Sequence, residues 1–214
     1  MGMLHSLLER VPGVSQQYRR PQGVRGWIAG DLMAEQHRPE NVWTISLLDV
    51  QPGERILEVG FGPGVALQRL LAQRKAAHVT GIDVSPTMVQ SARRRNLRAI
   101  NAGLLDLICA DVSQLPCASE SFDKVYSIHV LYFWPDPQPI LKELYRVLKP
   151  GGRLYLTFLP QEKWPGDAID SPACRIYTGE QLAASLLTAG FQHTSIESGP
   201  LDKNFREIAI VATR

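Results

Sequence analysis

The amino-acid sequence predicts an α/β fold: a doubly wound, seven-stranded, mostly parallel sheet with helices on both faces and a C-terminal antiparallel hairpin strand. Short apolar segments alternate with segments of helical periodicity between residues 56 and 158, which is typical of parallel strands joined by crossover helices. The first apolar segment ends in a glycine-rich turn, and the next two end in acidic residues. Near the C-terminus two strand-like segments follow one another without an intervening helix, which favours antiparallel pairing there.

The composition is that of an ordinary globular protein. The 214 residues are 44% hydrophobic and 21% charged, with a formal net charge of +2, so a nucleic-acid partner is not favoured. This length favours one sizeable core. We expect residues 51–214 to form the main domain, and residues 1–50 to form an N-terminal flap and helix that pack on it.

Cysteine usage and hydropathy predict a cytoplasmic protein. Cys109, Cys117 and Cys174 are odd in number and contain no C-x-x-C pair, so neither a disulfide framework nor a zinc site is suggested, and no metal is expected. No window approaches 18 apolar residues, and residues 1–10 lack the apolar core of a signal peptide. A membrane span is therefore not expected.

The glycine-rich turn lies at the centre of the predicted fold. The apolar strand Ile56–Val59 is followed by glycines at positions 60, 62 and 64, and residues 65–73 then have helical periodicity. In the dinucleotide-binding fingerprint the third glycine would stand at position 65, which is Val65 here. A nicotinamide-binding loop is therefore a poor match.

Acidic residues end the next two strands. The strand 78–83 closes with Asp83, about 20 residues beyond the glycine loop, where an acid commonly meets ribose hydroxyls in folds of this class. The strand 105–110 is followed by Asp111. Each acid could instead cap a turn. Because the carboxyl ends of parallel strands meet at one edge of a sheet, the pair favours a ligand site there.

Local signals delimit the other elements. Helix starts are expected at Ser85-Pro86, at Asp136-Pro137 and at the capping box Thr178–Gln181. An earlier helix, broken at Pro39, should precede the first strand and pack on the sheet edge. The remaining expected elements are helices ending near residues 96, 148 and 190, a loop over 160–174, and strands 124–129, 153–158, 192–197 and 207–212.

These motifs together resemble one family. Glu58-x-Gly60-x-Gly62-x-Gly64 resembles the signature of class I S-adenosylmethionine-dependent methyltransferases, and matches follow in the family's order up to Leu148–Gly152, which resembles its turn into the fifth strand. Between them lie Asp83, Asp111-Val112, Leu115-Pro116 and Phe122-Asp123. The resemblance covers residues 54–214 and is greatest to the small-molecule type related to the ubiquinone and menaquinone C-methylating group. It implies a Rossmann-like sheet and S-adenosylmethionine (SAM) as cofactor, with S-adenosylhomocysteine (SAH) as product.

The resemblance also implies a set of cofactor-binding residues. In this family the glycine loop wraps the amino-acid end of SAM, the acid after the second strand meets the ribose, and the acid after the third lies beside the adenine. Met88 could equally be core filler on its helix. The implied cofactor-binding residues are Glu58, Gly60, Phe61, Gly62, Gly64, Asp83, Val84, Met88, Asp111, Val112 and Ser127.

The methyl acceptor is expected beyond the fourth strand. His129 is the titratable side chain there suited to act as a general base, although a lone histidine is more often structural. Tyr132, Phe133 and Trp134 are either an apolar acceptor wall or a packed loop. Residues 18–37 could close as a lid, with Tyr18, Trp27, Met33 and His37 over the ligand, or could simply pack as an edge helix.

Methyl transfer by in-line displacement to a small acceptor is the leading interpretation. A nicotinamide-dependent oxidoreductase with an irregular glycine loop and a non-catalytic SAM-binding module are the alternatives. The basic run Arg93–Arg95 is expected to be a solvated helix face rather than a nucleic-acid patch.

Overall fold

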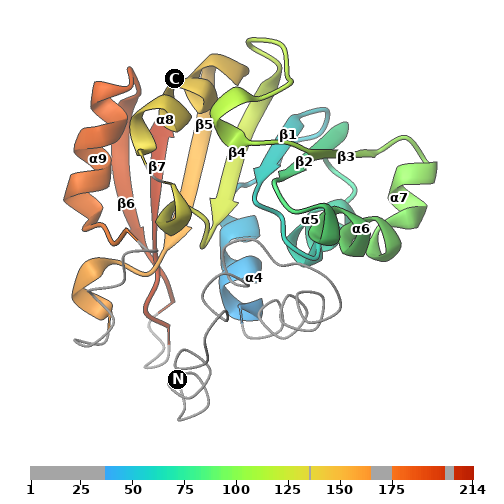
Figure 1. Ribbon diagram of the computed structural model, residues 1–214, viewed down its shortest axis with the longest axis horizontal. Helices are drawn as coiled ribbons and strands as arrows, with labels where there is room; N and C mark the ends of the chain where they lie inside the picture. The colour runs from blue at the N-terminus through green and yellow to red at the C-terminus, as the bar shows by residue number, and fades with distance from the viewer. Residues whose placement is uncertain (1–36, 135, 165–174, 201–204) are drawn as a thin grey trace.

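The computed structural model describes residues 37–134, 136–164, 175–200 and 205–214. Within them, seven strands form one sheet in the order β3-β2-β1-β4-β5-β7-β6 (Figure 1). The strands are β1 (Arg55–Val59), β2 (His78–Asp83), β3 (Leu105–Cys109), β4 (Phe122–Ile128), β5 (Leu148–Phe158), β6 (Gln192–Ser198) and β7 (Ile208–Thr213). The expected fold class is confirmed, while the flap expected over residues 1–36 lies outside the described residues.

The sheet is parallel except for its last strand. β1 pairs in parallel with β2 and β4, and β7 runs antiparallel to both β5 and β6. The predicted C-terminal hairpin is thus confirmed. Its second strand, β7, lies inside the sheet and leaves β6 at the edge.

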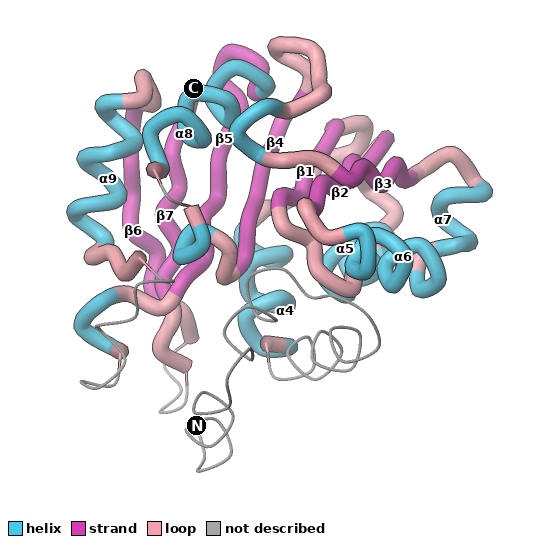
Figure 2. The backbone as a smooth tube through the Cα atoms, in the orientation of Figure 1, coloured by secondary structure: helices cyan, strands magenta, loops and turns pink. Residues whose placement is uncertain are grey.

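Helices pack on both faces of this sheet (Figure 2). The described α-helices are α4 (Arg38–Leu47), α5 (Val65–Ala72), α6 (Pro86–Arg95), α7 (Leu97–Asn101), α8 (Pro137–Val147) and α9 (Gly179–Thr188). Short 3₁₀ turns are η1 (Val112–Gln114), η2 (Leu131–Phe133) and η3 (Gln161–Lys163). None of the helices in the described part of the chain has the length and apolar character needed to cross a bilayer.

Side chains along the central strands point alternately to the two faces of the sheet, and this divides the core into two layers. Leu57, Val125 and Leu156 join one buried cluster with α8 and α9, while Ile56 and Tyr126 join a second cluster with α4 and α5. Successive strand residues point to opposite faces, so strands covered on both sides read as nearly continuous apolar runs. This pattern explains why the strands could be located from the sequence.

The predicted helix starts are confirmed as side-chain caps. The Ser85 hydroxyl accepts from the Met88 N–H, the Asp136 carboxylate accepts from the Gln138 N–H, and Thr178 forms a complete capping box with Gln181. Each cap supplies a partner for an N–H group that has none within its helix. These interactions span only three residues, which is why they could be predicted locally.

The predicted end of a helix near Asn96 is confirmed: α6 ends at Arg95, and Asn96 departs from helical geometry and donates its side-chain amide to Gly64 O, after which the separate short helix α7 begins. Two other expectations need correction. β5 already starts at Leu148, ahead of the Pro150–Gly152 turn. The helix before the first strand does not pack on the sheet edge: α4 lies against the centre, where Thr44 Oγ1 and Thr157 Oγ1 of β5 are 2.7 Å apart.

Candidate functional site

The predicted site residues gather where four parallel strands end. β1 lies between β2 and β4, so the chain order reverses beside it, and ligands bind at such switch points in open α/β sheets. Backbone hydrogen bonds continue past the strand ends, from Gly60 N to Ile82 O at 2.7 Å and from Ala110 N to Asp83 O at 3.1 Å. The loops that follow β1, β2 and β3 are therefore held side by side.

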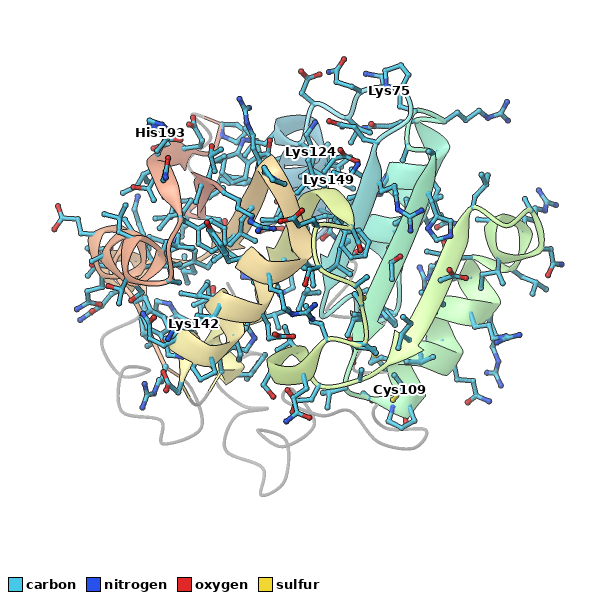
Figure 3. All side chains as sticks on the ribbon, turned by 90° about the horizontal axis from the view of Figure 1, so that it is seen from above. Lys75, Cys109, Lys124, Lys142, Lys149 and His193 are labelled. Carbon is cyan, nitrogen blue, oxygen red and sulfur yellow. The ribbon has the colours of Figure 1, made fainter. Side chains whose placement is uncertain are left out.

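A polar hollow at the opposite end of the sheet is a poorer candidate. It has a volume of about 340 Å³ and lies around Lys124 and Lys149. Figure 3 shows these lysines at the other end of the strands from Cys109, which ends β3. Lys124 pairs with Glu54 and Lys149 with Asp123, each at 2.7 Å. Their charges are thus engaged within the protein.

The three glycines of the loop after β1 serve different purposes. All have positive φ, between 53° and 78°, which favours glycine. A Cβ at Gly60 would lie 2.4 Å from Val130 Cγ2, and one at Gly64 would lie 2.7 Å from Ala92 Cβ. A Cβ at Gly62 would meet no heavy atom of the described residues within 4 Å. Gly60 and Gly64 therefore allow close packing, whereas Gly62 faces open space.

Asp83 braces this loop from the neighbouring strand. Its carboxylate accepts from Gly62 N at 2.9 Å through one oxygen and from Ser85 N at 2.8 Å through the other. Burial raises the pKa of Asp83, and these two hydrogen bonds oppose that rise. Each oxygen keeps a lone pair for a further donor. The structural and ligand-binding interpretations of Asp83 are therefore compatible.

Glu58 lies beneath the loop, within the protein. Its Oε2 accepts the Tyr126 hydroxyl at 2.6 Å, across the paired strands β1 and β4. Burial raises the pKa of Glu58 to about 8, and the Tyr126 hydrogen bond lowers it in part. Glu58 is 3% exposed, so it supports the loop from below.

The other residues of the implied cofactor set divide into surface and core. Val84 and Asp111 are exposed beyond β2 and β3, and Asp111 caps η1 by accepting from Ser113 N at 2.8 Å. This bond lowers the pKa of Asp111. Phe61, Met88 and Ser127 are buried, and Val112 is half-buried. The structure brings the set to one end of the sheet but gives Met88 a core position.

His129 follows the end of β4 and is unusual in its backbone conformation and in the enclosure of its ring. Its φ is +57°, and its Nδ1 lies 3.1 Å from the Tyr132 hydroxyl. Its Nε2 is enclosed and has no hydrogen-bond partner among the described residues. Burial lowers the pKa of His129 well below 6.5, and the neighbouring His37 lowers it further. The imidazole is therefore neutral near pH 7.

The residues expected at the acceptor side differ in burial and location. Tyr132 and Trp134 are buried in the core, and Phe133 is half-buried against it. His37 stands at the N-terminus of α4, with its ring centroid 4.2 Å from that of His129. Tyr18, Trp27 and Met33 lie outside the described residues. The structure thus joins His37 to His129 and places two of the three consecutive aromatics in the packed interior.

Sequence reasoning missed two residues of this region. Glu40 lies beside His37 and His129, and Tyr126 is the partner of Glu58. A signal for Glu40 did exist, because three residues separate it from His37 on one helical face. The sequence contains no such signal for Tyr126, because its contact with Glu58 depends on the register between two strands.

Comparison with known proteins identifies the family. Residues 57–156 match the family model described as "Methyltransferase domain". The chain is also 37% identical over 187 residues to an uncharacterized methyltransferase, YdaC of Bacillus subtilis (strain 168), covering 87% of this chain and 96% of that protein. This chain belongs to the methyltransferase family. It is an S-adenosylmethionine-dependent methyltransferase.

Other relatives agree with this assignment at the level of the domain. A 24-methylenesterol C-methyltransferase of Arabidopsis thaliana is 34% identical over 131 residues, which are 61% of this chain and 36% of that protein. Among solved structures, the complex between the Haloferax volcanii Trm112 methyltransferase activator and a putative methyltransferase gives a TM-score of 0.77. The identity there is 23%, over 86% of this chain and 93% of that one, so this likeness concerns the fold.

We predict that Gly62→Ala folds normally but binds SAH weakly. The new methyl group would enter the open side of the loop, while the left-handed backbone would cost only about 1–2 kcal/mol. Circular dichroism would check the fold and calorimetry the affinity. Undiminished SAH affinity would show that the ligand does not approach Gly62.

Gly60→Ala provides the contrasting case. Its Cβ overlaps Val130, so the variant should lose stability, and adding Val130→Ala should recover much of the loss. Denaturant unfolding of the single and double variants measures this coupling. Independent, additive effects would contradict the packing role of Gly60.

A second prediction concerns stability and pH. The pKa of Glu58 is about 8 in the folded protein and 4.5 ordinarily, so the folded state binds the additional proton between these values. Wild-type stability should therefore fall relative to Glu58→Gln as pH rises from about 4.5 to 8, by up to about 1.4 kcal/mol per pH unit. Denaturant unfolding of both proteins at several pH values tests this. Parallel stability curves would mean that Glu58 does not carry a raised pKa.

Proposed function

We propose that this methyltransferase acts on a small-molecule acceptor, by in-line displacement, at the carboxyl ends of β1 to β4. One observation carries the cofactor assignment: Gly62 faces open space while its N–H is held by the buried Asp83 carboxylate. A backbone that a ligand can approach and an acid fixed beside it are the two features needed to hold a ribose and an amino-acid moiety.

The residues present fit S-adenosylmethionine. Gly62 leaves room for the ligand, Asp83 can accept two ribose hydroxyls with its remaining lone pairs, and the exposed Val84 and Asp111 flank the adenine position. The cofactor has no pyrophosphate, so the lack of a basic cradle is no obstacle. When bound, it supplies a methyl group already activated on a sulfonium.

The protein's contribution is then mainly positioning. Orienting the reactants can supply about 7–11 kcal/mol of a barrier. His129 follows β4, beside the glycine loop after β1, and carries a neutral imidazole with an enclosed nitrogen. We assign it to the acceptor side, where it can take a proton if the acceptor must lose one. Residues 18–37 as a lid, and the boundary near residue 50, remain predictions.

A small acceptor is supported by the relatives. Besides the sterol methyltransferase, an arsenite methyltransferase of Halobacterium salinarum is 31% identical over 163 residues, covering 72% of this chain and 40% of that protein. The structural neighbour with an activator protein points to partner-dependent action as the competing case. Membership of the quinone C-methylating group and a cytoplasmic location stay predictions from the sequence.

Ligand titration tests the cofactor assignment. We expect SAM and SAH to bind and NADH not to bind, as measured by calorimetry. Asp83→Ala should weaken SAH binding by about 1.5–3 kcal/mol, the range for hydrogen bonds to charged groups. Asp106→Ala is the matched control, because Asp106 lies on neighbouring β3 with its side chain 70% exposed. NADH binding without any response to SAM or SAH would overturn the assignment.

Methyl-labelled SAM then tests the acceptor class. Incubation with a metabolite extract should place the label in the small-molecule fraction. Label found only in protein, or only after a partner protein is added, would contradict a small acceptor used by the chain alone.

A further prediction separates chemistry from cofactor binding. His129→Ala should lower turnover by roughly 10² or more, in the range of general acid–base effects, with little change in SAH affinity. Because the pKa of His129 is well below 6.5, wild-type turnover should not fall through protonation of His129 between about pH 8 and pH 6.5. His193→Ala, at an exposed position on β6, is the control. Equal losses of stability and turnover in His129→Ala would assign the residue a structural role.

A further inference from the structure

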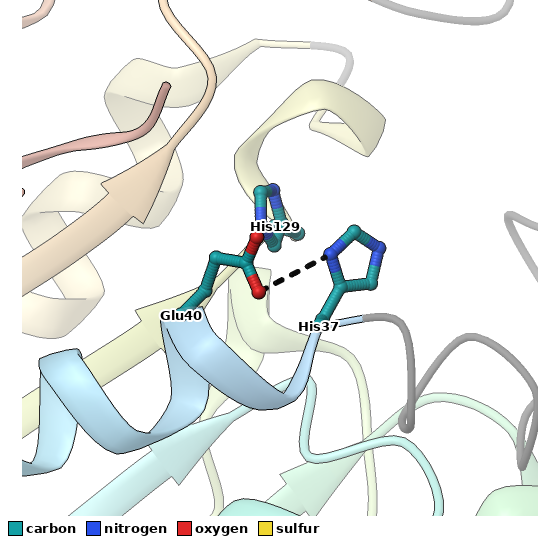
Figure 4. Close-up of side chains that lie close together, drawn as sticks. All are labelled: His37, Glu40 and His129. Atoms are coloured by element: carbon teal, nitrogen blue, oxygen red, sulfur yellow. Dashed lines mark ion pairs between the residues drawn. The ribbon is translucent and has the colours of Figure 1, made fainter. Parts of the chain in front are cut away.

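Three potential metal ligands from two distant segments meet near the end of β4. His37 and Glu40 stand on the first turn of α4, and His129 follows β4 (Figure 4). The cysteine spacing alone had predicted no metal. One nitrogen from each histidine and a Glu40 oxygen all lie within 4.8 Å of one another.

The cluster contains polar atoms that lack hydrogen bonds. His129 Nε2 and Glu40 Oε2 are both enclosed, and neither has a hydrogen-bond partner among the described residues. Glu40 Oε2 lies 4.0 Å from His37 Nδ1, too far for a hydrogen bond. Leaving a buried polar group without a hydrogen bond is unfavourable. Two such atoms at one point indicate a missing partner.

The electrostatics of the cluster favour a cation. Glu40 is largely enclosed, with its side chain 12% exposed, and the carboxylate of Glu207 lies close enough to act on it electrostatically. Two acids therefore face the cluster, together with the imidazoles of His37 and His129. A bound cation would stabilise the ionised form of Glu40 and accept the lone pairs of both rings.

We propose that His37, Glu40 and His129 bind one divalent transition-metal ion of the zinc class. Two imidazoles and a carboxylate suit such borderline ions, whereas Mg²⁺ and Ca²⁺ prefer oxygen ligands. Ligand atoms around a tetrahedral zinc lie about 3.4 Å apart, so the cluster must contract on binding. His37, whose side chain is 39% exposed, has room to move.

The surroundings are arranged to hold such ligands. Binding through Nε2 requires a proton on Nδ1 of His129, which can donate it to the Tyr132 hydroxyl 3.1 Å away. The same hydroxyl accepts from Leu159 N at 2.5 Å. The Thr44–Thr157 hydrogen bond ties α4 to the sheet and fixes the first turn of that helix relative to β4 and β5. Glu40 and His129 are therefore held by anchored elements, while His37, at the start of the helix, can adjust.

Three protein ligands leave a coordination position open, as in catalytic zinc sites. This inference rests on the proposed function: the open position would face the acceptor side and would take a hydroxyl- or thiol-bearing acceptor. A bound metal would lower the pKa of an acceptor group coordinated to it, so that the proton would leave to solvent and a nucleophilic oxygen or sulfur would remain. His129 then serves as a ligand, and it acts as a base only in the metal-free protein.

Direct metal titration tests the site. The full chain, stripped with a chelator, is titrated with Zn²⁺ by calorimetry and with Co²⁺ by visible absorption, which reports the coordination geometry. We expect one ion per chain and at least tenfold weaker binding in Glu40→Gln and in His37→Ala. Both substitutions are mild: one keeps the side-chain size, and the other removes a partly exposed ring.

His78→Gln is the matched control. His78 Nε2 lies 3.3 Å from Asp106, so this pair offers a histidine and a carboxylate, and no third ligand joins them within the part of the chain that the structure describes. It should bind Zn²⁺ like the wild type. Unchanged binding in both cluster variants, or loss of binding in His78→Gln alone, would overturn the proposal.

SAH titration of the same samples keeps the two proposals apart. Normal SAH affinity in Glu40→Gln with lost Zn²⁺ binding supports a metal site separate from the cofactor residues. Wild-type protein that binds Zn²⁺ but neither SAM nor SAH would overturn the proposed function and leave the metal site standing. The opposite result would overturn the metal site alone.

Discussion

The buried Asp83 carboxylate is the constraint on which the proposed cofactor site of this protein depends. It links the glycine loop after β1 to the start of α6 after β2, through hydrogen bonds to Gly62 and Ser85. Without it, two N–H groups at adjacent turns would lose their partner, and the open face of Gly62 would have no fixed position. In the proposed site, the same atoms that order the loop would present an acceptor to the ligand, so that stability and binding would share one side chain.

The proposed acceptor side depends on a second contact between neighbouring elements. β4 pairs with β1, which carries the glycine loop, and with β5, which is tied to α4 through Thr44 and Thr157. His129 therefore stands between the loop after β1 and the first turn of α4. Its neutral imidazole follows from enclosure by these elements, because desolvation disfavours the charged ring. A shift of α4 would reach His129 directly.

Much of this arrangement could be predicted from the sequence because its signals are local. Caps at Ser85, Asp136 and Thr178 act over three residues, and buried strands read as apolar runs. The rest depends on register and long-range packing. No sequence pattern reveals that Gly60 makes room for Val130 or that Tyr126 meets Glu58. His37 and Glu40 are likewise separated from His129 by the whole first half of the sheet, and only the fold brings them together.

The position of β7 has a consequence for how the chain reaches its folded state. β7 lies between β5 and β6, so β6 has no strand to pair with until residues 208–213 have been synthesised. During synthesis, β5 presents an unpaired edge and α9 has only part of its final surface beneath it. Such edges can associate with other chains. All strands from β1 to β4 are present once residue 128 has been synthesised, so this half can order earlier, and the sheet is completed only when the C-terminal strand arrives.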